Sequence, residues 1–214
     1  INILFSAVTE RWGQYENPLK KQLDLLGLKY QLAEDLPPDV VDYIIYAPNS
    51  SIKDFSIFTS LKAVLNLWAG VEDVVKNKTL QVPLARMVDE GLTQGMKEWV
   101  LGHVMRHHLG TDLHVFGQDG QWRDWSAPPL AKNRSVTVLG LGALGAQCAK
   151  TLSKIGFKVS GWSQSKKLIE NVICYYGSDG LEKSLQDAEI VVLLLPSTNE
   201  TENIINQKTI NYLS

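Results

Sequence analysis

The sequence predicts an α/β protein built on parallel sheets. Short β-like runs alternate with amphipathic stretches through the first third of the chain, and a glycine-rich turn joins a strand to a helix in the second half. The length of 214 residues is compatible with two modest domains, which we expect over residues 1–94 and 95–214. The strands expected in the first domain are Ile3–Phe5, Tyr43–Tyr46, Ala63–Leu67 and Pro83–Met87.

Two helices are expected before the glycine-rich turn. Asn17 can cap the first, with Pro18 in its first turn and Gly27 as its stop signal. The second, Gly95–Leu109, has apolar residues at spacings of three and four and should end at Gly110. The following stretch, Gly117–Asn133, contains Pro128-Pro129 and two tryptophans and is predicted to be a surface connection.

Composition excludes several classes of protein. The chain carries 21 Lys and Arg against 23 Asp and Glu, so a general nucleic-acid surface is not expected. No apolar run approaches a membrane span, and the N-terminus shows no signal pattern, so we expect no membrane partner and a cytoplasmic protein. Cys148 and Cys174 lack metal spacing and are predicted to be reduced core residues. His103 is followed by Val104 where a zincin would have glutamate, so no metal site is predicted at His103 and His107.

The strongest chemical signal is the strand Ser135–Leu139 entering a glycine turn, with a helix over Ala146–Ile155 that Gly156 can end. This order of strand, turn and helix is typical of a Rossmann-type dinucleotide site. Its first glycine permits a tight turn, its second lets the backbone approach a pyrophosphate, and its third allows close packing of helix and strand. The predicted cofactor-binding residues are Gly140, Gly142, Ala143, Leu144 and Gly145.

The next strand, Phe157–Trp162, indicates which dinucleotide is preferred. An NAD-binding fold usually places Asp or Glu at its end, whereas this sequence has Ser163, Gln164, Ser165, Lys166 and Lys167. Hydroxyl and ammonium groups can bind a 2′-phosphate through charge-assisted hydrogen bonds. NADP(H) is therefore the preferred cofactor, with NAD(H) as the alternative, unless the two lysines merely occupy a solvated turn.

Two further turns are candidates. Ile190–Leu195 is a continuous apolar run typical of a strand buried on both faces, and Ser197 with Glu200 matches a helix capping box. Leu195 and Pro196 would then lie at the ligand-binding edge, although a plain strand end explains them equally well. In the first domain the turn Trp68, Ala69, Gly70, Val71 could present amides to an anion, but by itself it is more simply a tight turn.

Four segments together resemble the D-isomer-specific 2-hydroxyacid dehydrogenases. They are Trp68–Val71, Gly95–Trp99, the Gly140–Gly145 turn and Leu195–Thr201. Two further groups resemble the glyoxylate/hydroxypyruvate reductase A branch, which uses NADPH: Leu84-Ala85-Arg86 with Asp89 and Gly91, and Gly161-Trp162-Ser163.

The resemblance implies a flavodoxin-like substrate (catalytic) domain and a Rossmann-type NAD(P)-binding domain with a doubly wound parallel sheet. It implies reduction of small 2-oxo acids to D-2-hydroxy acids by hydride transfer, with the acid's carboxylate on the amides of Ala69, Gly70 and Val71. Trp68 replaces a smaller residue and would narrow the pocket, and Gln164 stands where the branch often has arginine. Relatives form homodimers through the helix matching Gly95–Leu109, so a homodimer is expected.

The family also uses an arginine, a glutamate and a histidine for catalysis. No arginine follows Arg134 and no histidine follows His114, so no catalytic residue is carried over to this chain, and little turnover is expected from it. Ile190–Leu195 would form an apolar outer edge of an incomplete sheet, which suggests a piece of a longer protein. The resemblance, with the half-finished βαβαβ plan, implies a length of about 300 residues. A nucleotide-sensing binding protein on the same fold is the alternative function, and a methyltransferase is disfavoured.

Overall fold

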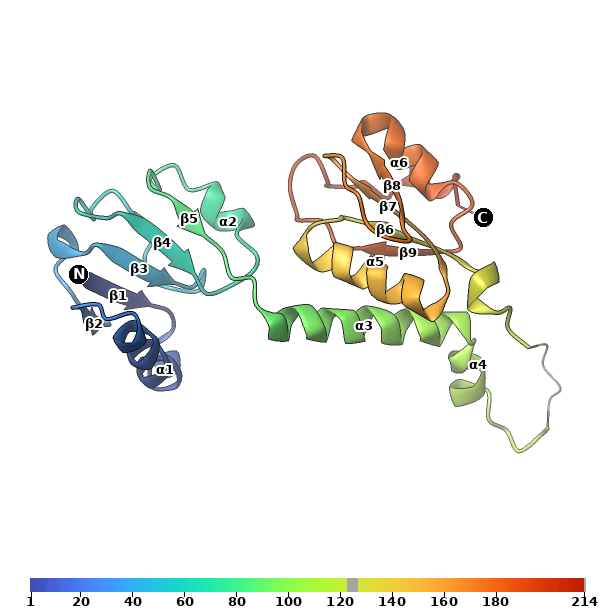
Figure 1. The fold of residues 1–214 in the computed structure, drawn as a ribbon, viewed down its shortest axis with the longest axis horizontal. Helices are drawn as coiled ribbons and strands as arrows, with labels where there is room; N and C mark the ends of the chain where they lie inside the picture. The colour runs from blue at the N-terminus through green and yellow to red at the C-terminus, as the bar shows by residue number, and fades with distance from the viewer. Residues whose placement is uncertain (123–126, 214) are drawn as a thin grey trace. The chain divides into compact units, whose positions relative to one another are not determined.

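The computed structural model describes residues 1–122 and 127–213. The chain folds into two units, Ile1–Val88 and Asp89–Ser214, each with one parallel sheet and its own hydrophobic core (Figure 1). The two units meet between Val88 and Asp89, whereas the sequence places the boundary between residues 94 and 95. Parallel sheets flanked by helices confirm the predicted α/β class.

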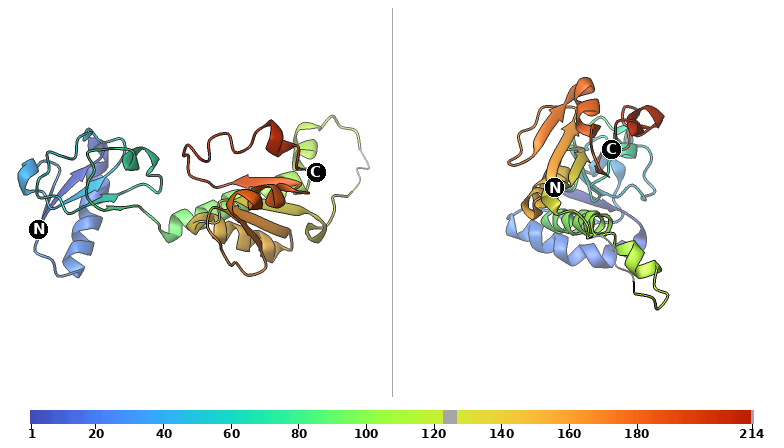
Figure 2. Two further views of the ribbon diagram at one scale, coloured as in Figure 1. Left: turned by 90° about the horizontal axis from the view of Figure 1, so that it is seen from above. Right: turned by 90° about the vertical axis from the view of Figure 1, so that its right-hand side faces the viewer.

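The first unit contains a five-stranded sheet in the order β2-β1-β3-β4-β5, which is a flavodoxin-like order. Alternate residues of β1 face opposite sides: Ile3 and Phe5 pack with α1, whereas Leu4 packs with Ile44 and Val64. Figures 1 and 2 show α1 lying against one face of this sheet. The elements are β1 (Asn2–Ser6), η1 (Thr9–Arg11), α1 (Trp12–Leu25), β2 (Gln31–Ala33), η2 (Pro38–Val40), β3 (Tyr43–Tyr46), β4 (Ala63–Asn66), α2 (Glu72–Val75) and β5 (Leu84–Ala85).

The predicted start of the first helix is wrong. Helix α1 begins at Trp12, so that Asn17 and Pro18 lie inside it. The rings of Trp12 and Tyr15 pack 5.2 and 5.5 Å from the ring of Phe5. We attribute the early start to burial of these two aromatic side chains, which outweighs the backbone hydrogen bond that a proline cannot donate. The end is as predicted: Gly27 has a φ of +65° and donates its amide to Asp24 O at 2.9 Å.

The second unit contains a four-stranded sheet in the order β8-β7-β6-β9. It is doubly wound, because Val136 and Val138 of β6 face α3 and α5, whereas Leu139 packs with Leu185 of α6 on the other face. The elements are α3 (Glu90–His108), α4 (Thr111–Phe116), η3 (Ala131–Asn133), β6 (Ser135–Leu139), α5 (Ala143–Ile155), β7 (Lys158–Ser163), β8 (Ile173–Tyr176), α6 (Gly177–Leu185), β9 (Ile190–Leu193) and α7 (Gln207–Ile210).

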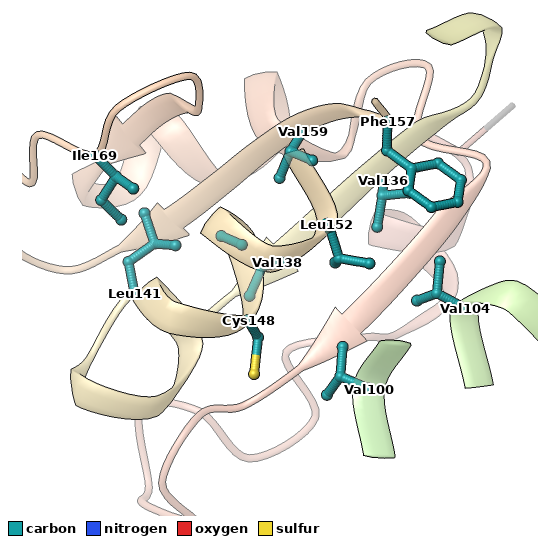
Figure 3. Close-up of a cluster of buried hydrophobic side chains, with 11 residues drawn as sticks. Val100, Val104, Val136, Val138, Leu141, Cys148, Leu152, Phe157, Val159 and Ile169 are labelled. Atoms are coloured by element: carbon teal, nitrogen blue, oxygen red, sulfur yellow. The ribbon is translucent and has the colours of Figure 1, made fainter. Parts of the chain in front are cut away.

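Figure 3 shows the core between this sheet and its helices. Val100 and Val104 of α3 and Cys148 and Leu152 of α5 surround the valines of β6. Cys148 is buried and Cys174 is half-buried, and both are free, as predicted. None of the helices in the described part of the chain is both long and apolar enough to span a membrane.

Helix α3 starts earlier than the predicted Gly95. Asp89 caps it by accepting a hydrogen bond from the Leu92 amide at 2.9 Å, so the true signal is an aspartate cap. The predicted stop is confirmed, because Gly110 has a φ of +62°. Helix α5 also starts early, at Ala143 rather than Ala146, because the helix already begins inside the glycine turn.

Strand β9 departs from its prediction in two ways. It stops at Leu193, and it is not buried on both faces: Ile190, Val191 and Val192 are half-buried and Leu193 is exposed. The reason is that, among the described residues, β9 pairs with β6 alone and forms the outer strand, which agrees with the predicted apolar edge. An open groove of about 490 Å³ lies between β9 and α3.

The predicted capping box at Ser197 and Glu200 is also wrong. The segment forms turns in which Thr201 Oγ1 accepts a hydrogen bond from the Thr198 amide at 2.9 Å. A capping box does form further along, where Asn206 and Thr209 start α7. Both segments have polar residues three apart, so the spacing alone does not separate a helix start from a turn.

The sequence patterns did not predict β2, α2, α4, β8, α6 or α7. Strands β2 and β8 are short and lie at sheet edges, and Ile173 and Tyr176 at the two ends of β8 are exposed, so neither strand forms a long buried apolar run. Within the predicted surface connection Gly117–Asn133, the described residues form only the short turn η3. The part of that prediction over residues 123–126 lies outside the described residues.

Candidate functional site

The Gly140–Gly145 turn has the geometry that its three glycines predict. Gly140 has a φ of +106°, and a Cβ there would lie 2.5 Å from the carbonyl oxygen of Leu194. A Cβ on Gly145 would lie 1.7 Å from the carbonyl oxygen of Gly140. A side chain at Gly140 would therefore push away the segment after β9, and one at Gly145 would push α5 away from β6 and the turn.

Gly142 differs from the other two glycines of the turn. A Cβ on Gly142 would meet no heavy atom within 4 Å, so the space in front of this residue is open. Gly142 is the N-cap of α5 and provides no side-chain cap for the helix. Among the hydrogen bonds of the described residues, none is donated by the amides of Gly142, Ala143 or Leu144. An uncapped start of a 13-residue helix offers free N–H groups and the positive end of the helix dipole to an anion.

The segment after β9 runs directly beside this turn. Leu194 donates its amide to Leu139 O at 2.8 Å, and the Leu195 amide nitrogen lies 3.0 Å from the position of a Cβ on Gly140. The Leu195 side chain packs on the cluster of Leu139, Trp162 and Leu185, whereas Pro196 is exposed. The glycine turn and the segment Leu195-Pro196, both predicted to bind the cofactor, are thus brought together at the carboxyl ends of β6 and β9. The hydrogen bond from Thr198 lowers the pKa of Glu200 in the turn that follows.

The predicted 2′-phosphate residues lie at the carboxyl end of β7, which is parallel to β6 and ends at the same edge of the sheet. Ser163 is buried, and its hydroxyl donates to Ser165 O at 2.8 Å. Gln164, Ser165, Lys166 and Lys167 are exposed. Ser163 therefore shapes the loop, and it would have to exchange this hydrogen bond to reach a phosphate.

Gly161, which belongs to one of the segments that resemble the reductase A branch, is also sterically required to be glycine. A Cβ on Gly161 would lie 2.6 Å from Leu141 Cδ2 and 3.0 Å from Val138 O. Leu141 is the second residue of the glycine turn and is buried, so Gly161 makes the space into which this turn folds. A lone glycine inside an otherwise continuous strand pattern was the available signal.

The turn of the first unit follows β4. Trp68 is 48% exposed, Gly70 is exposed, and Ala69 and Val71 are half-buried. The side-chain amide of Asn66 donates to Trp68 O at 2.7 Å and to Gly70 O at 3.0 Å. None of the hydrogen bonds found among the described residues is donated by the backbone amides of Ala69, Gly70 or Val71. Glu72 Oε2 lies 2.9 Å from the position of a Cβ on Gly70, so a carboxylate lies next to this turn.

The histidines do not form a metal centre. Nowhere in the described ranges are three His, Cys, Asp or Glu side chains grouped to hold an ion. His103 and His107 line the groove beside β9, and the His103 ring lies 4.4 Å from that of Trp99. His108 is buried against Phe157, and burial, aided by the charge of Arg134, lowers its pKa.

The sequence and the fold both match known proteins. Residues 99–214 match the family model of the D-isomer specific 2-hydroxyacid dehydrogenase, NAD binding domain. Glyoxylate/hydroxypyruvate reductase A of Serratia proteamaculans is 34% identical over 162 residues, which cover 72% of this chain and 51% of that protein. The reductase A of Yersinia enterocolitica is 28% identical over all of this chain and 70% of its own length. The chain thus spans about half the length of some of the curated relatives that it matches.

Two solved structures extend the likeness to the fold. A D-isomer specific 2-hydroxyacid dehydrogenase from Xanthobacter autotrophicus in complex with NADPH has a TM-score of 0.88 and 33% identity, over 99% of this chain and 69% of that one. An NADPH-dependent glyoxylate/hydroxypyruvate reductase from Sinorhizobium meliloti, in complex with NADP and sulfate, has a TM-score of 0.77 and 31% identity, over 100% and 67%. The chain belongs to the D-isomer-specific 2-hydroxyacid dehydrogenase family, in the branch that resembles glyoxylate/hydroxypyruvate reductase A.

Proposed function

We propose that the protein takes part in the NADPH-dependent reduction of small 2-oxo acids, of the glyoxylate and hydroxypyruvate class, to D-2-hydroxy acids. The observation that carries this proposal is the open, uncapped helix start at Gly142, in the same unit as the segment 163–167, which has two lysines and no acid. Relatives named for the same reaction, and solved with NADPH or NADP, support it.

The residues at the sheet edge fit a dinucleotide. We assign the diphosphate to the amides of Gly142, Ala143 and Leu144, because they have no hydrogen-bond partner among the described residues and Gly142 faces open space. We assign a 2′-phosphate to the exposed loop that begins at Ser163 and includes Gln164, Ser165, Lys166 and Lys167. A carboxylate at the end of β7 would repel this phosphate, and residues 163–167 include none. Leu195 and Pro196 run alongside and are assigned to the same site.

We assign the carboxylate of the 2-oxo acid to the turn of the first unit. The amides of Ala69, Gly70 and Val71 are donors without partners among the described residues. Trp68 is half exposed beside them and would limit the size of the group attached to the keto carbon. When bound, NADPH supplies a hydride to the keto carbon. We assign no residue of this sequence to polarise the keto oxygen or to protonate it, because no arginine follows Arg134 and no histidine follows His114.

The test is a titration of the protein with NADPH, followed by cofactor fluorescence, with Gly142→Ala as the diagnostic variant. The backbone of Gly142 is extended, and an added methyl meets nothing, so the variant should lose at most about 1 kcal/mol of cap preference. Its methyl would occupy the space of the diphosphate, so the affinity for NADPH should fall about tenfold or more. An unchanged affinity in Gly142→Ala, or no binding by the unaltered protein, would contradict the proposal.

Turnover separates this proposal from a cofactor sensor. A sensor would bind NADPH in the same turn, but the full-length protein would then consume no NADPH with glyoxylate, hydroxypyruvate or other small 2-oxo acids. Consumption of NADPH with a 2-oxo acid would exclude the sensor.

We also propose that the protein forms a homodimer through α3. Trp99 on this helix is 67% exposed, and aromatic side chains are enriched at protein–protein interfaces. Sedimentation should give a dimer that Trp99→Lys weakens. A monomer at micromolar concentration would contradict this assignment.

A further inference from the structure

The Asn66 side chain is buried in an unusual way. The residue is 5% exposed, and its two hydrogen bonds from Nδ2 both go to carbonyl groups of the turn that follows, those of Trp68 and Gly70. Its Oδ1 atom is buried without a hydrogen-bond partner among the described residues. An unpaired buried acceptor is unfavourable, so the position is better explained by what the two donated bonds do than by burial of the amide.

Those two bonds fix the direction of two peptide groups. In a trans peptide the carbonyl of one residue and the N–H of the next point in opposite directions. No cis peptide is found in the described residues. Because the carbonyls of Trp68 and Gly70 point toward Asn66, the N–H groups of Ala69 and Val71 point away from it. The amide of Met87 also donates to Trp68 O, at 3.2 Å, which holds the first of these carbonyls from a second side.

The strand before the turn supplies a fixed base. Asn66 is the last residue of β4 and lies opposite Tyr46 of β3 in register, and Leu67 donates its amide to Tyr46 O at 2.8 Å. The backbone leaves the sheet only after Leu67. Asn66 is therefore anchored by the sheet, while the turn it organises has few other constraints.

We infer that Asn66 is a positioning residue for the carboxylate site: its side-chain amide turns two carbonyls inward so that the N–H groups of Ala69 and Val71 face the 2-oxo acid. The inference rests on the proposed function, because it assumes that this turn binds the substrate carboxylate. The inference adds a residue that does not itself touch the substrate, so a search for substrate contacts would not find it. Asn66 itself is buried beneath the turn and acts through the backbone.

The experiment measures binding of glyoxylate by amide NMR, following Ala69, Gly70 and Val71, with the uncharged methyl ester of glyoxylate as a second probe. Asn66→Leu keeps the size of the side chain and removes both donors. We expect its affinity for glyoxylate to fall about tenfold, with no change in its affinity for NADPH. The weak response to the ester should be the same in both proteins, because the oriented amides act on the charge.

Asn77→Leu is the matched control. Asn77 also donates its side-chain amide to a backbone carbonyl, that of Lys53 at 2.8 Å, and it organises a different loop of the same unit. It should cost stability without changing glyoxylate binding. If Asn66→Leu does not fold, Asn66→Ser takes its place, because serine keeps one donor. We expect its affinity for glyoxylate to fall a few-fold.

The outcomes separate the inference from the proposed function. If glyoxylate does not perturb the three amides in the unaltered protein, the carboxylate site itself is wrong. If glyoxylate binds there, and folded Asn66→Leu or Asn66→Ser binds it equally well, the positioning role is overturned. If Asn77→Leu weakens glyoxylate binding as much as Asn66→Leu does, the effect is general destabilisation, and the role is likewise overturned.

Discussion

The two turns assigned to anions are built by different means. In the second unit the turn is shaped by what is absent, because Gly140 and Gly145 have no side chain to collide with Leu194 O and Gly140 O. In the first unit it is shaped by a side chain, because Asn66 holds two carbonyls inward. The first arrangement exposes the start of a long helix, and the second exposes individual peptide groups. The turn of the second unit should therefore be disrupted when a side chain is added, and that of the first unit when a side chain is removed.

The largest effect is expected for Gly145→Ala. The added methyl would lie 1.7 Å from the carbonyl oxygen of Gly140, and a backbone atom cannot rotate away, so helix and strand must separate. We expect a loss of about 3 kcal/mol in unfolding free energy and of most NADPH binding, measured by denaturant titration and cofactor fluorescence.

Gly102→Ala is the control for that experiment. Gly102 lies within α3 in the same unit, and a Cβ there meets nothing within 4 Å, so alanine should be neutral or stabilising by up to about 1 kcal/mol. A Gly145→Ala protein as stable as Gly102→Ala would show that the packing of glycine turn and helix is not what shapes the site.

The difference between the turns also explains how much could be predicted from the sequence. A turn that requires glycine at fixed spacing, between a β-branched run and a helix, is visible in one sequence, and the parallel sheet follows from it. Asn66 carries no such mark, because its role depends on which carbonyls lie within reach after folding. In the same way, the early start of α1 depends on the packing of Trp12 and Tyr15, and that of α3 depends on the cap that Asp89 forms.

The second prediction concerns the choice of cofactor. Replacing both lysines (Lys166→Ala with Lys167→Ala) removes the two positive charges assigned to the 2′-phosphate. The affinity for NADPH should fall about tenfold or more and that for NADH should stay constant, which parallel titrations at fixed ionic strength would measure.

Lys154→Ala with Lys158→Ala is the matched pair. These lysines are also exposed and carry the same total charge, but they lie at the end of α5 and the start of β7, away from the glycine turn. If both double variants lost the same affinity for NADPH, the effect would come from net charge alone, and the assignment of the 2′-phosphate to this loop would be wrong.

The third prediction tests the acidic neighbour of the first turn. Glu72 Oε2 lies 2.9 Å from the position of a Cβ on Gly70, so its charge opposes an incoming carboxylate. Glu72→Gln should tighten glyoxylate binding about threefold at low salt, and the gain should shrink as salt is added. Asp73→Asn makes the same change of charge at the next, exposed residue and should have less effect. Weaker binding in Glu72→Gln would mean that this carboxylate supports the turn instead.

At the amino ends of their strands the two units are alike. Asp42 lies just before β3, accepts the amide of Asn2 at 2.8 Å and pairs with Lys62 at 2.8 Å. Glu189 lies just before β9, accepts the amide of Ser135 at 2.8 Å and pairs with Arg134 at 2.8 Å. Each acid thus ties a strand start to its neighbour. The contrast between the two anion turns lies at the carboxyl ends of the strands, where the anion sites are assigned.

The smallest effect is expected for these two acids, as a change in the stability of each unit at low pH. The hydrogen bond from Lys62 lowers the pKa of Asp42, and the hydrogen bond from the Ser135 amide lowers that of Glu189. A carboxyl whose pKa is lower in the folded state stabilises the fold above its usual pKa, and this contribution is lost as the pH falls through that range. Asp42→Asn and Glu189→Gln should each reduce the loss of stability between about pH 5 and about pH 3, each in its own unit. Amide NMR during acid titration resolves the two units, and exposed Glu202→Gln is the control. A response of one unit to both substitutions would show that the two acids do not act locally.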